Sequence, residues 1–188
     1  MSITKTAAMG ATTLASSALL AASVGAANAA TVQSAPAAVG TTATGAAAAP
    51  VSKQVPLSPH GYGRLKIGMS ERRARATGML ALKTHSRVCD GYDLKGHPTG
   101  RNSVSVYVSH KYGVALIQPP KSTRTTRGVH IGSTLAQAKH AYRGLRRDSR
   151  GYYSVSAPGN PRALYEFAVS HGKVSSMALA LKVQDCFN

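Results

Sequence analysis

The chain has 188 residues, with 23 Lys and Arg against six Asp and Glu, and a formal net charge of +17. This length allows one ordinary domain or two very small ones. A positive excess of this size produces a field that attracts polyanions and acidic protein surfaces.

Residues 1–29 have the pattern of a cleavable signal peptide. Lys5 gives a positive N-terminus, residues 7–22 carry no charge, and residues 27–29 (Ala-Asn-Ala) have the small side chains that a signal peptidase requires. The alternative is a membrane anchor, but the apolar run is short and rich in Ala, and no later segment resembles a span of about 20 residues. We therefore predict a secreted, extracellular protein without a membrane span, whose mature form begins at Ala30.

Residues 30–56 contain Ala, Thr, Pro, Gly and Val and almost no large side chains. Ordering them would bury too little apolar surface to offset the lost conformational entropy, so we predict a disordered spacer. A propeptide or a longer leader is the alternative. The folded domain is then residues 57–188, which contain all six acidic residues.

Cys89 and Cys186 are the two cysteines, and both lie in this domain. An even number of cysteines in an exported chain predicts a disulfide between them. A reactive catalytic thiol is the alternative.

The domain matches itself at a constant spacing of 64 residues. Ile67, Gly68, Ser70 and Ala74 correspond to Ile131, Gly132, Thr134 and Ala138. This offset is about half the domain, which indicates a tandem duplication with repeats at about 57–120 and 121–188.

Each repeat is predicted to begin with a helix of two to three turns. Ser70 and Thr134 are suitable N-caps, and Thr134 with Gln137 forms the pattern of a capping box. Gly78 and Gly144 stand where each helix should end.

Strands are predicted after each helix. Apolar residues alternate over 104–109, 165–169 and 177–183, an apolar run lies at 114–117, and glycine-containing turns lie at 110–113 and 170–173. The predicted fold is α+β, with two helix-plus-meander (αβββ) repeats forming one antiparallel sheet covered by two short helices.

The two helix starts, with the meander that follows each, resemble the β-lactamase inhibitor protein family. They are more distantly similar to the BamE-like outer-membrane assembly module, and the chain is similar to small exported proteins of high-GC Gram-positive bacteria. The resemblance implies an inhibitor-like fold. The chain departs from the inhibitor family at Ser133, where that family has Met, and in its single cysteine pair, which spans the repeats. Its basic charge also argues against β-lactamase as the target.

Catalytic patterns are not found in the sequence, and we predict no enzyme activity and no cofactor. The histidines, at 60, 85, 97, 110, 130, 140 and 171, lack the spacing of a metal site, so none is predicted. A small secreted hydrolase is the remaining catalytic alternative. It would need two carboxylates across a cleft, and no sequence feature places such a pair. Asp148 and Glu166 are instead predicted to form ion pairs with neighbouring Arg.

Basic residues form three groups that we predict as polyanion contacts, because Arg binds phosphate and carboxylate groups well. If the helices pack on one side of the sheet, two of these groups could approach each other. The groups are Arg72, Arg73 and Arg75 in the first helix, Lys121, Arg124 and Arg127 between the repeats, and Arg143, Arg146, Arg147 and Arg150 after the second helix.

Two functions remain open. The first is a non-enzymatic binding module, for example a protein inhibitor, that binds an acidic protein surface through the exposed face of the sheet. Its candidate contacts are Tyr107, Tyr112, Tyr152, Tyr153 and Tyr165. The second is a basic envelope protein held on a cell-wall polyanion or on anionic lipid. Nucleic acid is the less expected partner, because an exported protein meets it less often.

Overall fold

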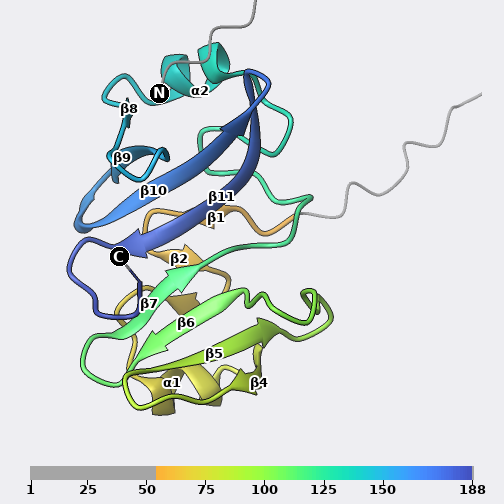
Figure 1. Cartoon of the computed structure of the whole chain (residues 1–188), viewed down its shortest axis with the longest axis vertical. Coiled ribbons are helices and arrows are strands. Elements are labelled where there is room, and N and C mark those ends of the chain that lie inside the picture. The colour runs from red at the N-terminus through yellow and green to blue at the C-terminus, as the bar shows by residue number, and fades with distance from the viewer. Residues whose placement is uncertain (1–53, 188) are drawn as a thin grey trace, which may run out of the picture. The chain divides into compact units, whose positions relative to one another are not determined.

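Two antiparallel sheets account for most of the ordered backbone in this protein (Figure 1). The computed structural model describes residues 54–187. The small sheet has the strand order β1-β2-β3, and the large sheet has the order β4-β5-β6-β7-β11-β10-β9-β8. The strands are β1 Leu57–Ser58, β2 Gly61–Tyr62, β3 Leu65–Lys66, β4 Leu80–Thr84, β5 Cys89–Leu94, β6 Val106–Ser109, β7 Gly113–Ile117, β8 Arg146–Arg147, β9 Tyr153–Ala157, β10 Asn160–Ser170 and β11 Lys173–Leu181.

Two short helices precede the two groups of four strands in the large sheet. Helix α1 (Glu71–Ala76) has six residues, and helix α2 (Leu135–Ala141) has seven. The predicted capping box at α2 is confirmed, since the Thr134 hydroxyl accepts from the Gln137 amide and the Gln137 side chain accepts from the Thr134 amide. Ser70 precedes α1 as predicted, but its side chain makes no capping hydrogen bond.

The predicted fold class is wrong. The described chain is mainly β, with two sheets instead of one, and each helix is followed by four strands instead of three. Helices of six and seven residues are too short to cover a sheet of eight strands. Part of the cover comes from the small sheet, whose two-residue strands leave no periodic pattern in the sequence.

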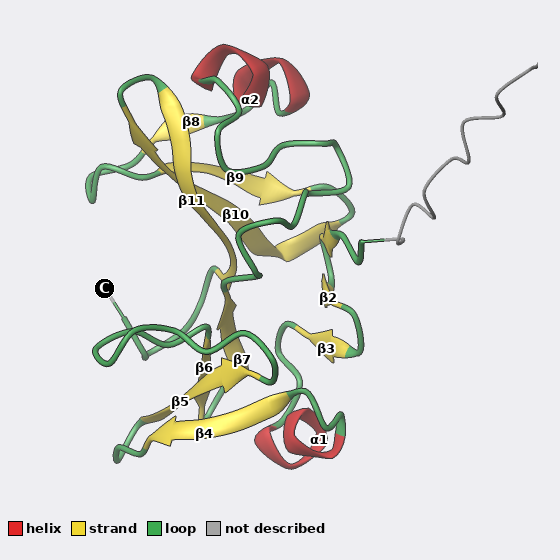
Figure 2. Cartoon of the chain, turned by 90° about the vertical axis from the view of Figure 1, so that its right-hand side faces the viewer, coloured by secondary structure: helices red, strands yellow, loops and turns green. Residues whose placement is uncertain are grey.

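The core lies between one face of the large sheet and the helices and small sheet. Val106, Val108, Tyr165 and Phe167 of the large sheet are completely buried on this face, as are residues of β1, β3, α1 and α2. Alternation along the strands then directs Tyr107, Leu116, Leu164 and Glu166 to the opposite face. Figure 2 shows the C-terminal segment on this opposite face, away from α1 and the small sheet.

The predicted disulfide is confirmed. Cys89 at the start of β5 bonds Cys186, and the bridge joins positions 97 residues apart in sequence. Residues 182–187 follow β11, the last strand, so the bridge fastens this C-terminal segment to the other half of the large sheet. Phe187 then packs against Tyr107 of β6, with ring centroids 5.9 Å apart.

The predicted signal peptide over 1–29 and most of the predicted spacer over 30–56 lie outside the described residues. Residues 54–56 form no helix or strand and are exposed. Within the range that is described, no helix has the length and apolar character needed to cross a membrane.

Candidate functional site

The face of the large sheet opposite the helices is hollowed in three connected places. The hollows have volumes of about 490 Å³, 240 Å³ and 270 Å³. Gln118 lines the first and the second, while Arg150, Glu166 and Phe187 line both the second and the third. We call the surface formed by the residues around these hollows the hollowed face.

Aromatic side chains surround the middle hollow. Tyr107 comes from β6, Tyr152 from the turn between β8 and β9, and Phe187 from the C-terminal segment. The side chain of Tyr152 is on the surface, with 41% of the residue exposed, and the guanidinium of Arg150 lies 5.5 Å from its ring centroid. The Tyr152 amide also donates to Asp148 Oδ1 at 3.0 Å, so the turn that carries this aromatic ring is fixed.

Arg150 joins two carboxylates beside the same hollow. Its Nη2 donates to Asp148 Oδ2 at 3.0 Å and to Glu166 Oε1, which confirms the ion pairs predicted for both acids. The bond to Glu166 is the main cause that raises the pKa of Arg150 above its ordinary value. Glu166 is buried in the middle of β10, where an unpaired carboxylate would be costly. The pair therefore fixes a cation at the centre of the hollowed face.

The five tyrosines predicted as contacts are not all on this face. Tyr107 and Tyr152 line it together, whereas Tyr165 is completely buried and its hydroxyl donates to the Leu57 carbonyl at 2.9 Å. Tyr153 is half-buried beside Lys139 of α2, on the core side. Tyr112 lies in the turn between β6 and β7, next to Lys111.

The basic groups predicted on the two helices do not approach each other. Figures 1 and 2 place α1 and α2 at opposite ends of the described domain, so Arg72, Arg73 and Arg75 are far from the group after α2. Of that second group, Arg150 lies on the hollowed face, and Arg146 and Arg147 form the edge strand β8. Arg143 is exposed between α2 and β8.

The basic group between the repeats divides between two places. Lys121 lines one end of the hollowed face. Arg124 and Arg127 line a separate hollow of about 530 Å³ beside α2, together with His130 and His140. No acidic residue of the described chain lines that hollow, and the Arg127 guanidinium is held by the Ala141 carbonyl at 2.7 Å.

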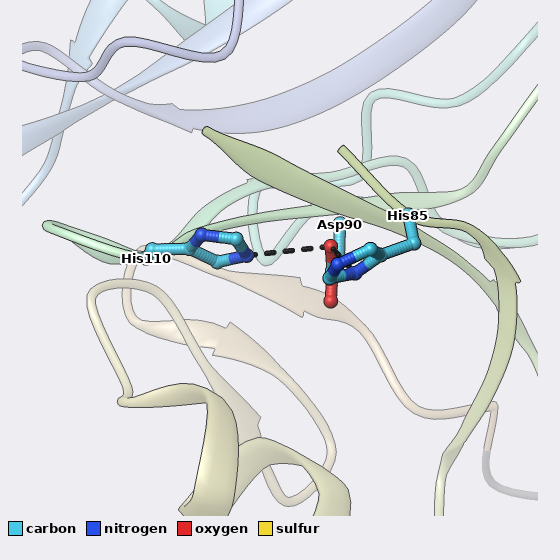
Figure 3. Close-up of side chains that lie close together, drawn as sticks. All are labelled: His85, Asp90 and His110. Atoms are coloured by element: carbon cyan, nitrogen blue, oxygen red, sulfur yellow. Dashed lines mark hydrogen bonds and ion pairs between the residues drawn. The ribbon is translucent and has the colours of Figure 1, made fainter. Parts of the chain in front are cut away.

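A cluster of His85, Asp90 and His110 was not foreseen from the sequence (Figure 3). Asp90 Oδ1 lies 2.7 Å from His85 Nδ1 and 3.3 Å from His110 Nε2. The Asp90 side chain is only 5% exposed, while the two imidazoles are 74% and 38% exposed. His85 follows β4, Asp90 lies in β5 and His110 follows β6. These three strands are neighbours in the large sheet. The three residues come together because of the register between β4, β5 and β6. The spacing of positions 85, 90 and 110 matches no metal-site motif, so the sequence does not predict the cluster.

Comparison with known proteins finds similarity to a solved structure. No protein-family model matches it, and no curated protein matches it. Among solved structures, it is similar to the crystal structure of the uncharacterized protein yfeY from Escherichia coli, at 14% sequence identity and a TM-score of 0.44. That match covers 68% of this chain and 99% of the other chain.

Proposed function

We propose that this protein is a secreted, non-catalytic binding module that takes up an acidic protein partner on the hollowed face. The observation that carries the proposal is that two packed pairs, Tyr107 with Phe187 and Tyr152 with Arg150, line one open hollow. Inhibition of an extracellular enzyme is one form that such binding takes, as the resemblance to the β-lactamase inhibitor protein family suggests.

The aromatic residues supply the anchoring energy. Tyr, Trp and Arg dominate the binding energy of protein interfaces, and rigid side chains lose little entropy when they bind. Phe187 packs against the Tyr107 ring, Arg150 lies over the Tyr152 ring, and Asp148 holds the backbone of Tyr152, so both aromatic residues have supporting contacts before a partner arrives. The disulfide supports the same arrangement because it retains Phe187 on this face.

The charge of the face favours an acidic partner. Among the described residues that line its three hollows, Glu166 is the single acid, and Arg150 pairs both with it and with Asp148 beside the middle hollow. Lys121 and Lys182 remain on the same surface without an acidic residue within ion-pair distance in the described chain. A positive surface of this kind speeds association with a negative one and disfavours basic partners.

Site-specific photo-crosslinking tests the proposal. A benzophenone amino acid is placed at Tyr152, at Tyr107 or, as a control, at Arg72 of α1, and each chain is incubated with supernatant from the producing cells. We expect one discrete protein adduct from positions 107 and 152 and none from position 72. An excess of unlabelled wild-type chain should suppress the adduct, whereas an excess of the Tyr107→Ala/Tyr152→Ala chain should not.

Two results would refute this function. One is an equal yield of adducts from all three positions, which indicates nonspecific contact. The other is an adduct from position 72 alone, which assigns the partner to the helix side of the domain.

The hollow beside α2 supports polyanion binding as a second candidate function. Arg124, Arg127, His130 and His140 line it, and Arg is suited to phosphate groups. Binding to a teichoic-acid-like polymer or to anionic lipid should weaken steeply as salt rises, because counterions are released on binding. Arg124→Glu/Arg127→Glu should then weaken retention on immobilised anionic polymer more than the same reversal at Arg72 and Arg73. Equal losses would show that only net charge matters.

A further inference from the structure

We propose that His85, Asp90 and His110 form a binding site for a divalent transition-metal ion of the zinc class. This site is separate from the hollowed face. The side chain of Asp90 lies on the same side of β5 as that of Tyr92, whose hydroxyl donates to Glu71 of α1. The neighbouring Cys89 lies on the other side of β5, where it bonds the C-terminal segment.

The donor set suits this class of metal. Two imidazole nitrogens and one carboxylate oxygen are ligands that zinc and related ions accept, and three protein ligands leave a further position for water. The ligand atoms of His85, Asp90 and His110 all lie within 4.8 Å of one another. Tetrahedral coordination with bonds of about 2.0–2.1 Å requires separations of about 3.3 Å. The His110–Asp90 distance of 3.3 Å already has this value. The His85–Asp90 distance of 2.7 Å reaches it after a small rotation of the exposed His85 ring.

The electrostatics of Asp90 favour a cation at this position. Its carboxylate is buried, and within residues 54–187 no Lys or Arg lies within ion-pair distance of it. Besides the two imidazoles, the Ser86 amide contacts the same oxygen, at the long distance of 3.4 Å. A buried carboxylate requires strong compensation, and a divalent ion held beside it provides that compensation. Each ring presents one nitrogen to Asp90, His85 through Nδ1 and His110 through Nε2. An ion bound there contacts these nitrogens in their unprotonated form, and each ring carries its proton on its other nitrogen.

The backbone around the cluster is held firmly enough to orient its side chains. The His110 amide donates to the Val88 carbonyl at 3.0 Å, which ties the turn after β6 to the start of β5. The Ser86 hydroxyl donates to the Cys89 carbonyl at 2.6 Å and accepts from the Cys89 amide at 3.1 Å, which closes the loop that follows His85. Sites on fixed elements lose less entropy when a ligand binds. His85 and His110 remain exposed, so an ion has access from solvent.

Calorimetric titration of the purified full-length chain with zinc chloride tests the proposal. We expect one saturable site in the wild-type chain. Loss of an indirect supporting residue weakens metal affinity by about 10–100-fold, so loss of a direct ligand in His85→Ala or His110→Ala should weaken it by at least about tenfold. His140→Ala removes an exposed histidine of α2 and should leave zinc affinity unchanged. Because His85 is mostly exposed, His85→Ala should keep the wild-type circular dichroism spectrum, which separates a lost ligand from a lost fold.

Cobalt substitution provides a second readout. Cobalt(II) bound by the wild-type chain should give visible absorption that His110→Ala abolishes and His140→Ala retains. Absence of saturable zinc binding would overturn the proposal and leave the cluster as a hydrogen-bonded triad only. Equal weakening by His85→Ala and His140→Ala would also overturn it, because zinc would then bind exposed histidines without a defined site.

Discussion

Asp93 shows how one carboxylate is held in this basic protein. Its Oδ2 accepts from Lys83 Nζ at 3.1 Å and from the Thr99 amide at 3.1 Å, while its Oδ1 accepts from the Thr99 hydroxyl at 2.6 Å. Burial by itself raises the pKa of Asp93. The bonds from Thr99 and Lys83 together outweigh burial, so the pKa is below its ordinary value. Asp93 thereby joins β5 to β4 and to the loop after β5.

A lowered pKa makes Asp93 a source of stability that acid removes. The stabilisation is complete above the unfolded-state pKa of about 3.9 and is lost as pH falls through the lower folded-state value. Asp93→Asn should therefore decrease the free energy of unfolding by about 1–3 kcal/mol at pH 7, and by less at pH 3, which lies below the unfolded-state pKa. Urea denaturation at both pH values measures this. Asp185→Asn, at an exposed position, is the control, and a deficit for Asp93→Asn that is the same at pH 7 and pH 3 would contradict the account.

The starts of the two helices differ in a way that stability measurements detect. The Thr134 hydroxyl accepts from the Gln137 amide at 3.1 Å, whereas the Ser70 side chain makes no such bond. Thr134→Ala should lower the free energy of unfolding by about 1 kcal/mol. Ser70→Ala removes no capping bond and should change it by less than about 0.5 kcal/mol. Thermal denaturation of both variants checks this, and equal losses would show that the capping box contributes nothing of its own.

The periodicity of apolar residues in the sequence is sufficient to locate the longer strands. It is not sufficient to predict how the strands are arranged in sheets. Alternation of apolar residues located β6, β10 and β11, because each of these strands has one face in the core and one face outside it, whereas a continuous apolar run located β7. Strands of two residues, such as β1 and β8, cannot show alternation. The strand count and the second sheet were therefore missed, and with them the fold class.

The candidate sites were predictable where the type or the number of residues determines them. The disulfide followed from the even number of cysteines, and the ion pairs of Arg150 followed from the residue types. The contact between Tyr107 and Phe187 depends on the path of the C-terminal segment, and the approach of His85 to His110 depends on strand register. Both are long-range consequences of folding that no spacing in the sequence records.

The disulfide acts on the whole domain because it closes a loop that spans most of it. Cys186→Ser should lower the free energy of unfolding by about 2–5 kcal/mol, since the unfolded chain regains the entropy of a 97-residue separation. Reductant should destabilise the wild-type chain by a similar amount and leave the Cys186→Ser chain unaffected. Guanidinium denaturation with and without reductant makes this comparison. A Cys186→Ser chain as stable as the oxidised wild type would contradict it.

Binding through the hollowed face and binding through the helix side of this domain predict opposite orders of affinity loss for two sets of substitutions. The most direct test measures the affinity of the crosslinked partner for three chains: wild type, Tyr107→Ala/Tyr152→Ala, and Arg72→Glu/Arg73→Glu/Arg75→Glu. Loss of two interface anchors should weaken binding by at least about 30-fold, which corresponds to about 2 kcal/mol. Charge reversal on α1, which lies on the other side of the large sheet from the C-terminal segment (Figure 2), should weaken it by less than about tenfold, and this smaller effect should fade as salt rises. The opposite order, with the α1 variant losing more affinity than the tyrosine variant, would contradict the assignment of the hollowed face.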